Sequence, residues 1–261
     1  GEIMVRREKS NYMIQAVAHA LDVLEQFHTD GELGVTELSK RLKLHKNNVF
    51  RILATLESRG YIEQNRSTEN YRLGTKCLQM GQTYIQHMGL LQQARPIMID
   101  VVKACHESTY VAVMRKGQVV PLDMVESDQP VRIVSHIGEN LPLHCTAAGK
   151  VHLAFEPAEE LQRCLAEGLP QLTIHTITDR EILAEQLKGV IATGYAVDNG
   201  EHLTDVHAIA VPIKDYTRTV VGSLVISGPA YRITQERIQN EIIPLIAKAG
   251  RELSSRLGYN S

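Results

Sequence analysis

Residues 35–73 read VTELSKRLKLHKNNVFRILATLESRGYIEQNRSTENYRL, with the pattern of two short helices, a tight turn and a basic hairpin. In the second helical segment, Val49, Ile52, Leu53 and Leu56 have the i, i+3, i+4, i+7 spacing of a helix that buries one face. An apolar stripe between residues 14 and 27 adds a helix before this pair. The order of these elements predicts a winged helix-turn-helix.

The exposed side of the second helix carries amide, guanidinium and hydroxyl groups, which can pair with base edges or phosphates in a major groove. Thr36 is expected to cap the N-terminus of the first helix of this pair. Gly60 has the position of a left-handed helix end, and residues 61–64 and 71–73 predict two strands around a wing with Arg66 near its tip. The candidate DNA-contacting residues are Thr36, Lys46, Asn47, Asn48, Arg51, Thr55, Arg66 and Tyr71.

Positive charge is concentrated in this segment. Residues 36–75 contain eight Lys or Arg and four Glu, a net charge of +4 in a chain of net charge -2. Helix pairs with a hairpin also occur in modules that bind only proteins, but a local basic patch attracts phosphates and favours double-stranded DNA as the partner.

Composition indicates a modular protein. With 261 residues, 43% of them hydrophobic and 22% charged, the chain is expected to form two domains. No apolar run approaches the roughly 20 residues of a membrane span, and the first residues lack the apolar core of a signal peptide, so we expect a cytoplasmic protein without membrane contact. The cysteines, Cys77, Cys105, Cys145 and Cys164, form no CxxC pair and are expected to be reduced thiols.

The chain divides by its patterns into an N-terminal tail (1–11), the winged helix-turn-helix (12–74), a linker helix that pairs with another subunit (75–94) and a mixed α/β domain (95–261). A hairpin is expected across Lys116 and Gly117. Further strands are expected at 131–135, 195–198, 207–214 and 219–227, and helices at 147–155, 157–166, 179–193 and 234–257. Such an order suits an antiparallel sheet covered by helices.

Several motifs occur in a characteristic order. The segment LHKNNVFRILATLESRGYI is followed by a linker and then by LPLHCTAAGKVHLAF, GYAVDNGEH and VVGSLVISGP. In this order, over residues 12–258, the chain resembles the IclR family of bacterial transcriptional regulators. The resemblance implies a winged-helix domain joined to a GAF-like α+β effector-binding domain.

The resemblance also implies a small-molecule pocket at the segments around Thr146–Gly149, Asp198 and Leu224–Ser227. A helix opening at Ala147 offers free amides that suit a carboxylate, although simple capping by Thr146 explains the same pattern. The candidate effector-binding residues are His144, Cys145, Thr146, Ala147, Ala148, Gly149, Asp198, His207, Ala208, Val225 and Ser227.

Three positions depart from the family pattern. Some members have Cys at the position of Ala208 and Ser at that of Val225, so this pocket has two fewer polar groups. The difference argues against two- or three-carbon oxo acids and for an effector with more apolar surface. His45 stands where the family's helix usually opens with Pro, a change expected to alter the turn only slightly.

A metal site or an enzyme active site would require characteristic spacings between side chains. His144, Cys145, Asp198, Glu201, His202 and His207 fall in the pocket segments, so zinc is an alternative, but no pair has the i, i+4 or CxxC spacing that presets ligand geometry. The chain also lacks the G-x-S-x-G, G-x-G-x-x-G, P-loop and H-E-x-x-H motifs. We therefore expect no metal, no cofactor and no catalytic residues, against an alternative of a metal-dependent or hydrolytic enzyme.

Together these features predict a ligand-responsive transcriptional regulator, a repressor of a catabolic operon that binds a pseudo-palindromic operator. Its effector is expected to be a small organic or aromatic acid. Symmetry makes a homodimer the minimum assembly, and the resemblance implies a homotetramer. A DNA-binding regulator whose C-terminal domain only mediates oligomerisation is the alternative.

Overall fold

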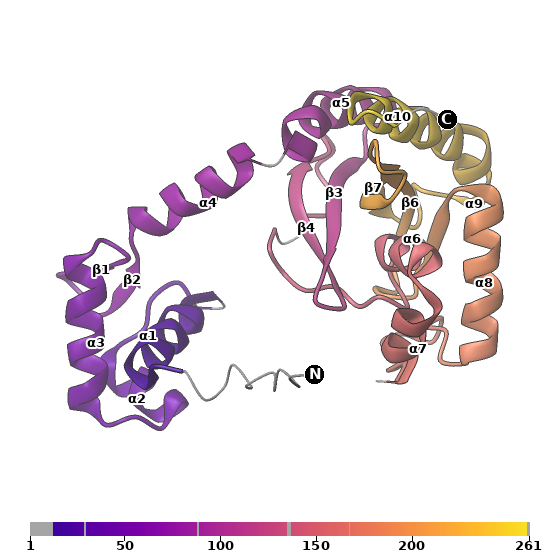
Figure 1. Ribbon diagram of the computed structural model, residues 1–261. Helices are drawn as coiled ribbons and strands as arrows, with labels where there is room; N and C mark the ends of the chain where they lie inside the picture. The colour runs from indigo at the N-terminus through magenta and orange to yellow at the C-terminus, as the bar shows by residue number, and fades with distance from the viewer. Residues whose placement is uncertain (1–12, 29, 88, 135–136, 167, 260–261) are drawn as a thin grey trace, which may run out of the picture. The chain divides into compact units, whose positions relative to one another are not determined.

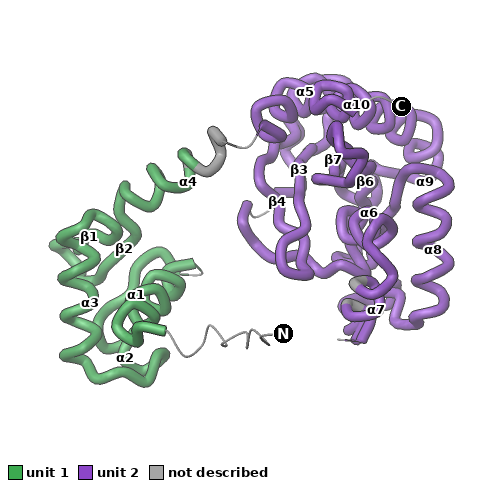
Figure 2. Tube along the Cα trace, viewed as in Figure 1, with its two compact units in different colours: residues 1–87 green, residues 88–261 purple. Residues whose placement is uncertain are grey.

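The chain forms two compact units, residues 1–87 and 88–261 (Figure 2). The structure is a computed structural model, and it describes residues 13–28, 30–87, 89–134, 137–166 and 168–259. The expected tail, residues 1–11, lies outside the described residues.

The first unit is a helical domain with a two-stranded wing (Figure 1). Its elements are α1 (Gln15–Glu25), a 3-10 turn (Gln26–His28), α2 (Val35–Leu42), α3 (Lys46–Ser58), β1 (Ile62–Gln64), β2 (Tyr71–Leu73) and α4 (Thr75–His87). The stripe predicted on α3 forms the centre of this domain, because Val49, Leu53 and Leu56 pack with Val23 of α1 and Leu38 of α2. The winged helix-turn-helix is confirmed.

Gly60 ends α3 as predicted, with a positive φ of 77°. The amide of Gly60 donates to the Glu57 carbonyl at 2.9 Å, and the amide of Tyr61 donates to the Leu56 carbonyl at 3.0 Å. This pair of bonds satisfies the last helical carbonyls and requires a left-handed residue, which glycine adopts without a Cβ clash. The chain then turns directly into β1.

The second unit is an α+β domain with a five-stranded sheet. It contains α5 (Gly89–Cys105), β3 (Ser108–Arg115), β4 (Gln118–Val125), α6 (Ala147–Phe155), α7 (Ala158–Ala166), α8 (Arg180–Thr193), β5 (Ala196–Asn199), β6 (Val206–Lys214), β7 (Val220–Pro229), α9 (Gln235–Arg237), a π-helical turn (Ile238–Ile242) and α10 (Ile243–Arg256). The strand order is β4-β3-β7-β6-β5, and each neighbouring pair is antiparallel.

Helices cover both faces of this sheet (Figure 1). On one face α5 and α10 pack over a core that includes Val111, Ile209 and Leu224. On the other face α6 and α8 pack over Tyr110, Ala210 and their neighbours. Because side chains alternate along a strand, each strand supplies both cores.

The start of this unit differs from the expected linker. Leu90, Leu91 and Ala94 belong to the first turns of α5 and are buried in the core against the sheet, and α5 runs on through Pro96 to Cys105. The first compact unit therefore ends at His87. Burial of the α5 stripe against the sheet maintains the helix even though Pro96 contributes no amide.

The strand expected at 131–135 was wrong for its described part, because residues 131–134 are neither helix nor strand. Val131 and Val134 are exposed. The open edge of β4 is instead contacted farther along the chain, where Leu141 bridges Val119. A short apolar run without a sheet edge beside it does not become a strand.

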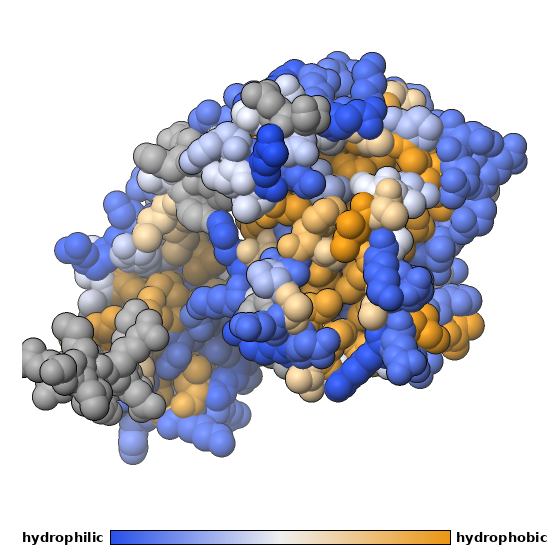
Figure 3. Space-filling view, turned by 45° about the vertical axis from the view of Figure 1, so that its right-hand side comes forward, coloured by the Kyte–Doolittle hydropathy of each residue, from blue (hydrophilic) through white to orange (hydrophobic). Residues whose placement is uncertain are grey.

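Hydrophobic side chains also reach the surface among hydrophilic ones (Figure 3). None of the helices in the described part of the chain has the length and apolar character needed to cross a membrane.

Candidate DNA-binding surface and effector site

The turn between α2 and α3 sets the direction of the second helix. Lys43 takes a left-handed φ of 55°, and the Leu44 amide donates to the Ser39 carbonyl at 3.2 Å. The Ser39 hydroxyl returns a bond to the Leu44 carbonyl at 2.6 Å. These bonds fix a tight turn of the kind that presents the second helix of a helix-turn-helix to DNA.

Thr36 does not cap α2, so that prediction was wrong. The helix begins at Val35 with Gly34 in the cap position, and Thr36 lies exposed in its first turn. The cause lies outside the local sequence: Leu33 pairs with Tyr71 through two 2.9 Å backbone bonds, which ends the extended segment at Gly34.

Tyr71 was also placed wrongly among the DNA-contacting side chains. Only 4% of it is exposed, and it packs with Val49, Leu53 and Ile62 in the core of the domain. Tyr71 begins β2 beside the wing loop, and its backbone bridge to Leu33 joins it to the segment that precedes α2.

Four of the predicted DNA-contacting residues of α3 fall on two sides of the helix. Asn47 and Arg51 lie opposite the buried stripe, at the roughly 100° per residue of an α-helix. Asn48 and Thr55 line a groove of about 860 Å³ between α1, α3 and α4, which Arg51 also borders. The Thr55 hydroxyl donates to the Arg51 carbonyl at 2.8 Å, so its proton is used within the helix.

Most of the basic charge in this unit is available to a ligand. Arg41 pairs with Asp30 and Glu37 at 2.6 and 2.9 Å, and Arg72 pairs with Glu63 at 2.7 Å. Among the described residues, no carboxylate pairs with the other cations of residues 36–75. These are Lys40, Lys43, Lys46, Arg51, Arg59 and Arg66.

The loop of the wing is held by Glu32. This carboxylate accepts bonds from Asn65 at 2.8 Å and Thr68 at 3.0 Å, and these bonds lower the pKa of Glu32. Arg66 stays exposed in the loop between β1 and β2. The wing therefore holds a free cation on an anchored loop.

In the second unit, the sheet register gathers several predicted effector residues. Asp198 pairs with Ala208, Ala208 with Ser227, and Ser227 with Ser108, so four strands contribute to one row. Val225 pairs with Ala210 in the adjacent row on the same face, under α6. The antiparallel pairing places residues more than 100 positions apart in the chain side by side on neighbouring strands.

The first turn of α6 is held by its own sequence. The Thr146 hydroxyl accepts a bond from the Gly149 amide at 3.0 Å and donates to the Pro142 carbonyl at 2.7 Å. A Cβ on Gly149 would lie 2.2 Å from the Leu143 carbonyl oxygen. Thr146 thus caps the helix, and Gly149 allows its close packing on residues 142–143, while Ala147 and Ala148 are buried against the sheet.

A buried charge cluster lies beside this turn. Lys150, with 1% of its surface exposed, donates to Glu201 and to the Val197 carbonyl at 2.6 Å each, and to Gln186 at 3.2 Å. Asp198 accepts a bond from the Glu201 amide at 2.7 Å. Burial, with Glu201 adding to it, raises the pKa of Asp198 to about 7.

Lys150 and Tyr110 were missed by the sequence analysis, which considered Glu201 only as a possible metal ligand. Tyr110 pairs with Val225 on the same face of the sheet, and burial first, with Asp198 second, raises the pKa of its phenol. Burial, with Asp198 and Glu201, also raises the pKa of the Cys145 thiol to about 12. The sequence signal for Lys150 was a charge inside the apolar helix AAGKVHLAF.

The histidines of the site contact backbone carbonyls. A ring nitrogen of His144 lies 2.9 Å from the Pro170 carbonyl oxygen, and one of His207 lies 2.8 Å from that of Ile233. His144 also borders a cavity of about 310 Å³. Within the described ranges, no three His, Cys, Asp or Glu side chains are grouped to hold a metal ion.

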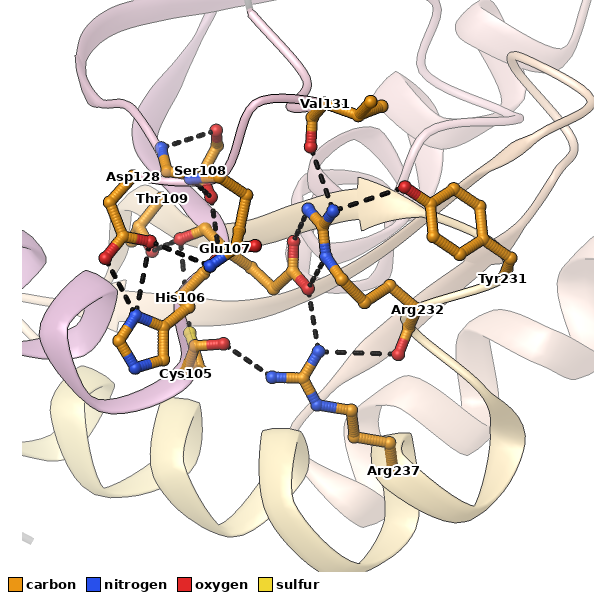
Figure 4. A network of polar contacts seen from close by, with 12 residues as sticks. Cys105, His106, Glu107, Ser108, Thr109, Asp128, Val131, Tyr231, Arg232 and Arg237 are labelled. Carbon is orange, nitrogen blue, oxygen red and sulfur yellow. Dashed lines mark hydrogen bonds and ion pairs between the residues drawn. The ribbon is translucent and has the colours of Figure 1, made fainter.

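A second polar network supports one end of the sheet row (Figure 4). The fully buried Glu107 precedes Ser108 and accepts three bonds from Arg232 and Arg237. Its carboxylate lies so close to Gly228 that a Cβ there would be 2.4 Å away. The network therefore ties the start of β3 to the end of β7, beside Ser227.

Comparisons with known proteins agree in both units. Residues 16–66 match the IclR helix-turn-helix domain, and residues 82–255 match the bacterial transcriptional regulator IclR C-terminal domain.

Named relatives align over nearly the whole chain. The regulator KdgR of Dickeya chrysanthemi is 31% identical over 254 residues, covering 97% of this chain and 83% of its own. XynR of Escherichia coli (strain K12) is 31% identical over 250 residues, covering 95% of this chain and 98% of its own. The repressor AllR of Klebsiella pneumoniae is 30% identical over 246 residues, covering 94% of this chain and 90% of its own.

Solved structures share the fold. The Thermotoga maritima IclR has a TM-score of 0.80 at 28% identity, with 95% of this chain and all of the other covered. An IclR homologue from Microbacterium hydrocarbonoxydans, complexed with 4-hydroxybenzoate, has a TM-score of 0.83 at 23% identity, with 93% and 99% covered.

Proposed function

The chain belongs to the IclR family of bacterial transcriptional regulators, and on this premise we propose that it represses a catabolic operon in response to a small organic or aromatic acid. The chain is a regulator with a DNA-binding helix-turn-helix domain and a C-terminal ligand-binding domain, and its named relatives are regulators rather than enzymes. Repression is supported by the relative AllR, which is named a repressor.

The observation that carries the DNA-binding assignment is the surface of α3. Asn47 and Arg51 are exposed opposite a fully buried stripe, and Lys46 and Arg51 have no carboxylate partner among the described residues. Arginine pairs well with guanine, and asparagine with adenine, in the major groove. We therefore assign Arg51 and Asn47 to base reading, and Lys46 and Arg66 to phosphate contacts.

The apolar side of α1 and α4 supports a homodimer. Val17 and Leu21 on α1, and Leu78 and Met80 on α4, are more than half exposed, and Val17, Leu21 and Met80 border the 860 Å³ groove. A contiguous apolar surface of this kind marks an interaction site. Two α3 helices in such a dimer would meet successive major grooves about 34 Å apart, and two dimers would form the tetramer.

The effector is assigned to the row of Asp198, Ala208 and Ser227 beneath α6. The Ser227 hydroxyl is buried without a partner among the described residues, and so is Oε2 of Glu201. Buried polar atoms without partners cost free energy, so a ligand that bonds to them is favoured. The relative crystallised with 4-hydroxybenzoate supports an aromatic acid as one effector class.

The experiment that tests this function measures DNA affinity and effector response together. A duplex is selected from a random library by the wild-type protein, and binding is followed by fluorescence anisotropy at fixed salt, with and without each acid of a panel. Arg51→Ala is expected to weaken binding by about 1–3 kcal/mol. Arg256→Ala, which removes an arginine paired with Glu252 on α10, is the charge-matched control and should bind like wild type.

A second variant tests the assignment of the effector site. Asp198→Ala is expected to bind the duplex but not to release it with the acid, because the carboxylate lies in the effector row. Thermal shift gives a second readout, since a ligand that binds only the folded state raises the melting temperature. DNA binding without any acid response would favour a C-terminal domain that serves assembly alone.

A further inference from the structure

Phe50 is an aromatic side chain exposed on the DNA-reading helix. The chain has three phenylalanines, and Phe27 is in the core of the first unit while Phe155 is half-buried. Phe50, in contrast, is 54% exposed in the middle of α3. Among the described residues, Phe50 is not part of the core cluster of its domain.

The helix geometry places Phe50 beside the reading face. At roughly 100° per residue, its neighbours along the surface are Asn47 and Ala54, three residues before and four after. It also shares a flank with Glu57, two turns later, whose carboxylate accepts a bond from the Gln64 amide of β1 at 3.2 Å. Phe50 therefore lies on the wing side of α3.

The opposite flank is the one that borders the apolar groove. Asn48 and Thr55 line that groove with α1 and α4, and Phe50 does not. An apolar partner seated in the groove would thus leave Phe50 uncovered. Lys46 lies one turn before Phe50 and Arg51 lies on the adjacent reading face, and neither has a carboxylate partner among the described residues. Charge of this sign suits DNA as the occupant of the Phe50 surface.

We propose that Phe50 reads the 5-methyl group of a thymine in the operator and is a specificity-determining residue of this regulator. The inference rests on the proposed function, in which α3 enters the major groove. Among the groups that a base pair presents in that groove, the thymine methyl is the apolar one, and an aromatic side chain is a fitting contact for it. Asn47 and Arg51 read hydrogen-bonding groups, and Phe50 adds an apolar contact beside them on the wing side.

The expected size of the effect follows from the methyl group. Burying one such group changes a binding equilibrium about fourfold. In a symmetric dimer on two half-sites, replacing both thymines should therefore weaken binding about 15-fold in total.

The experiment uses uracil, which lacks only the methyl group. In the duplex selected by the wild-type protein, each thymine is replaced by deoxyuridine in turn, and dissociation constants are measured by anisotropy. The wild type is expected to lose about fourfold at one thymine position of each half-site. Phe50→Ala should bind the thymine and uracil duplexes equally, while Phe50→Leu should keep part of the difference because it retains apolar surface.

Controls separate this contact from other roles of Phe50. Tyr216→Ala removes an exposed aromatic ring from the second unit and should respond to uracil like wild type. A wild-type protein that tolerates uracil at every position would overturn the proposal. So would Phe50→Ala losing affinity for both duplexes together with a smaller assembly in gel filtration, because Phe50 would then be a subunit contact. A wild-type protein that selects no duplex would contradict the proposed function itself.

Discussion

The carboxylate of Glu107 is fully buried between two arginines, and Glu107→Gln is expected to destabilise the second unit (Figure 4). Oε1 accepts bonds from Arg232 Nε at 2.6 Å and from Arg237 Nη1 at 2.7 Å, and Oε2 accepts one from Arg232 Nη2 at 2.6 Å. Glutamine keeps one oxygen and places an amide group against the remaining guanidinium nitrogen. One hydrogen bond becomes a contact between two donors, and the other two are left with a neutral acceptor in place of a carboxylate.

The magnitude follows from burial. Breaking a buried ion pair costs about 3–5 kcal/mol, and a hydrogen bond to a charged group contributes about 1.5–3 kcal/mol. The side chains of both arginines are 22% exposed and can regain water, so we place the loss near the lower limit, at about 3 kcal/mol. For a unit of this size, that loss corresponds to a melting temperature lower by about 6–12 °C.

Differential scanning calorimetry of the full chain measures this effect. The matched control is Glu252→Gln, because Glu252 also binds an arginine, Arg256, at 2.6 Å but with its side chain 49% exposed. An exposed pair contributes only about 0–1 kcal/mol, so the control should melt within about 4 °C of wild type. Equal shifts for the two variants would refute the reasoning, since the two pairs have the same distance and differ in burial.

Three further outcomes are expected. Asp198→Asn should be more stable than wild type above pH 7, with the gain shrinking toward pH 4. The pKa of Asp198 is raised to about 7 in the folded protein, whereas the unfolded chain loses this proton near pH 3.8. The stability of the wild type therefore falls as the pH rises from about 4 to 7. A stability gain of Asp198→Asn that does not change with pH, measured by denaturant unfolding, would contradict this prediction. Gly149→Ala should lower stability by about 1–3 kcal/mol because of the Leu143 backbone, whereas Gly189→Ala, a helical glycine with open space around its Cβ position, should raise it by about 0.5–1 kcal/mol in the same calorimetric assay. Leu78→Asp should shift the assembly toward monomer in analytical ultracentrifugation, and an unchanged mass would remove this residue from the dimer surface.

Sequence patterns predicted the first unit well because its elements are local. The apolar stripe of α3 and the left-handed end at Gly60 depend on residues within a few positions of one another. The failures there came from pairing across the domain. The bridge between Leu33 and Tyr71 moved the start of α2 away from Thr36 and buried a residue expected on the DNA side.

In the second unit, periodicity predicted most helices and strands but not their neighbours. The helix expected at 234–257 forms as α9, a π-helical turn and α10, with Pro244 in the first turn of α10. The residues of α5 carried a helical pattern, but only contact with the sheet showed that they belong to the core. A local pattern records which face is apolar and does not identify what covers it.

The sequence by itself determined the winged helix-turn-helix, the concentration of positive charge in residues 36–75, and the segments of the effector domain, because these depend on helical and strand periods and on composition. The tertiary structure decided which residues meet. Antiparallel register set Ser108, Ala208, Asp198 and Ser227 in one row, and folding joined Glu107 to Arg232 across 125 positions. Such pairs depend on strand order and burial, which arise only when distant segments pack together.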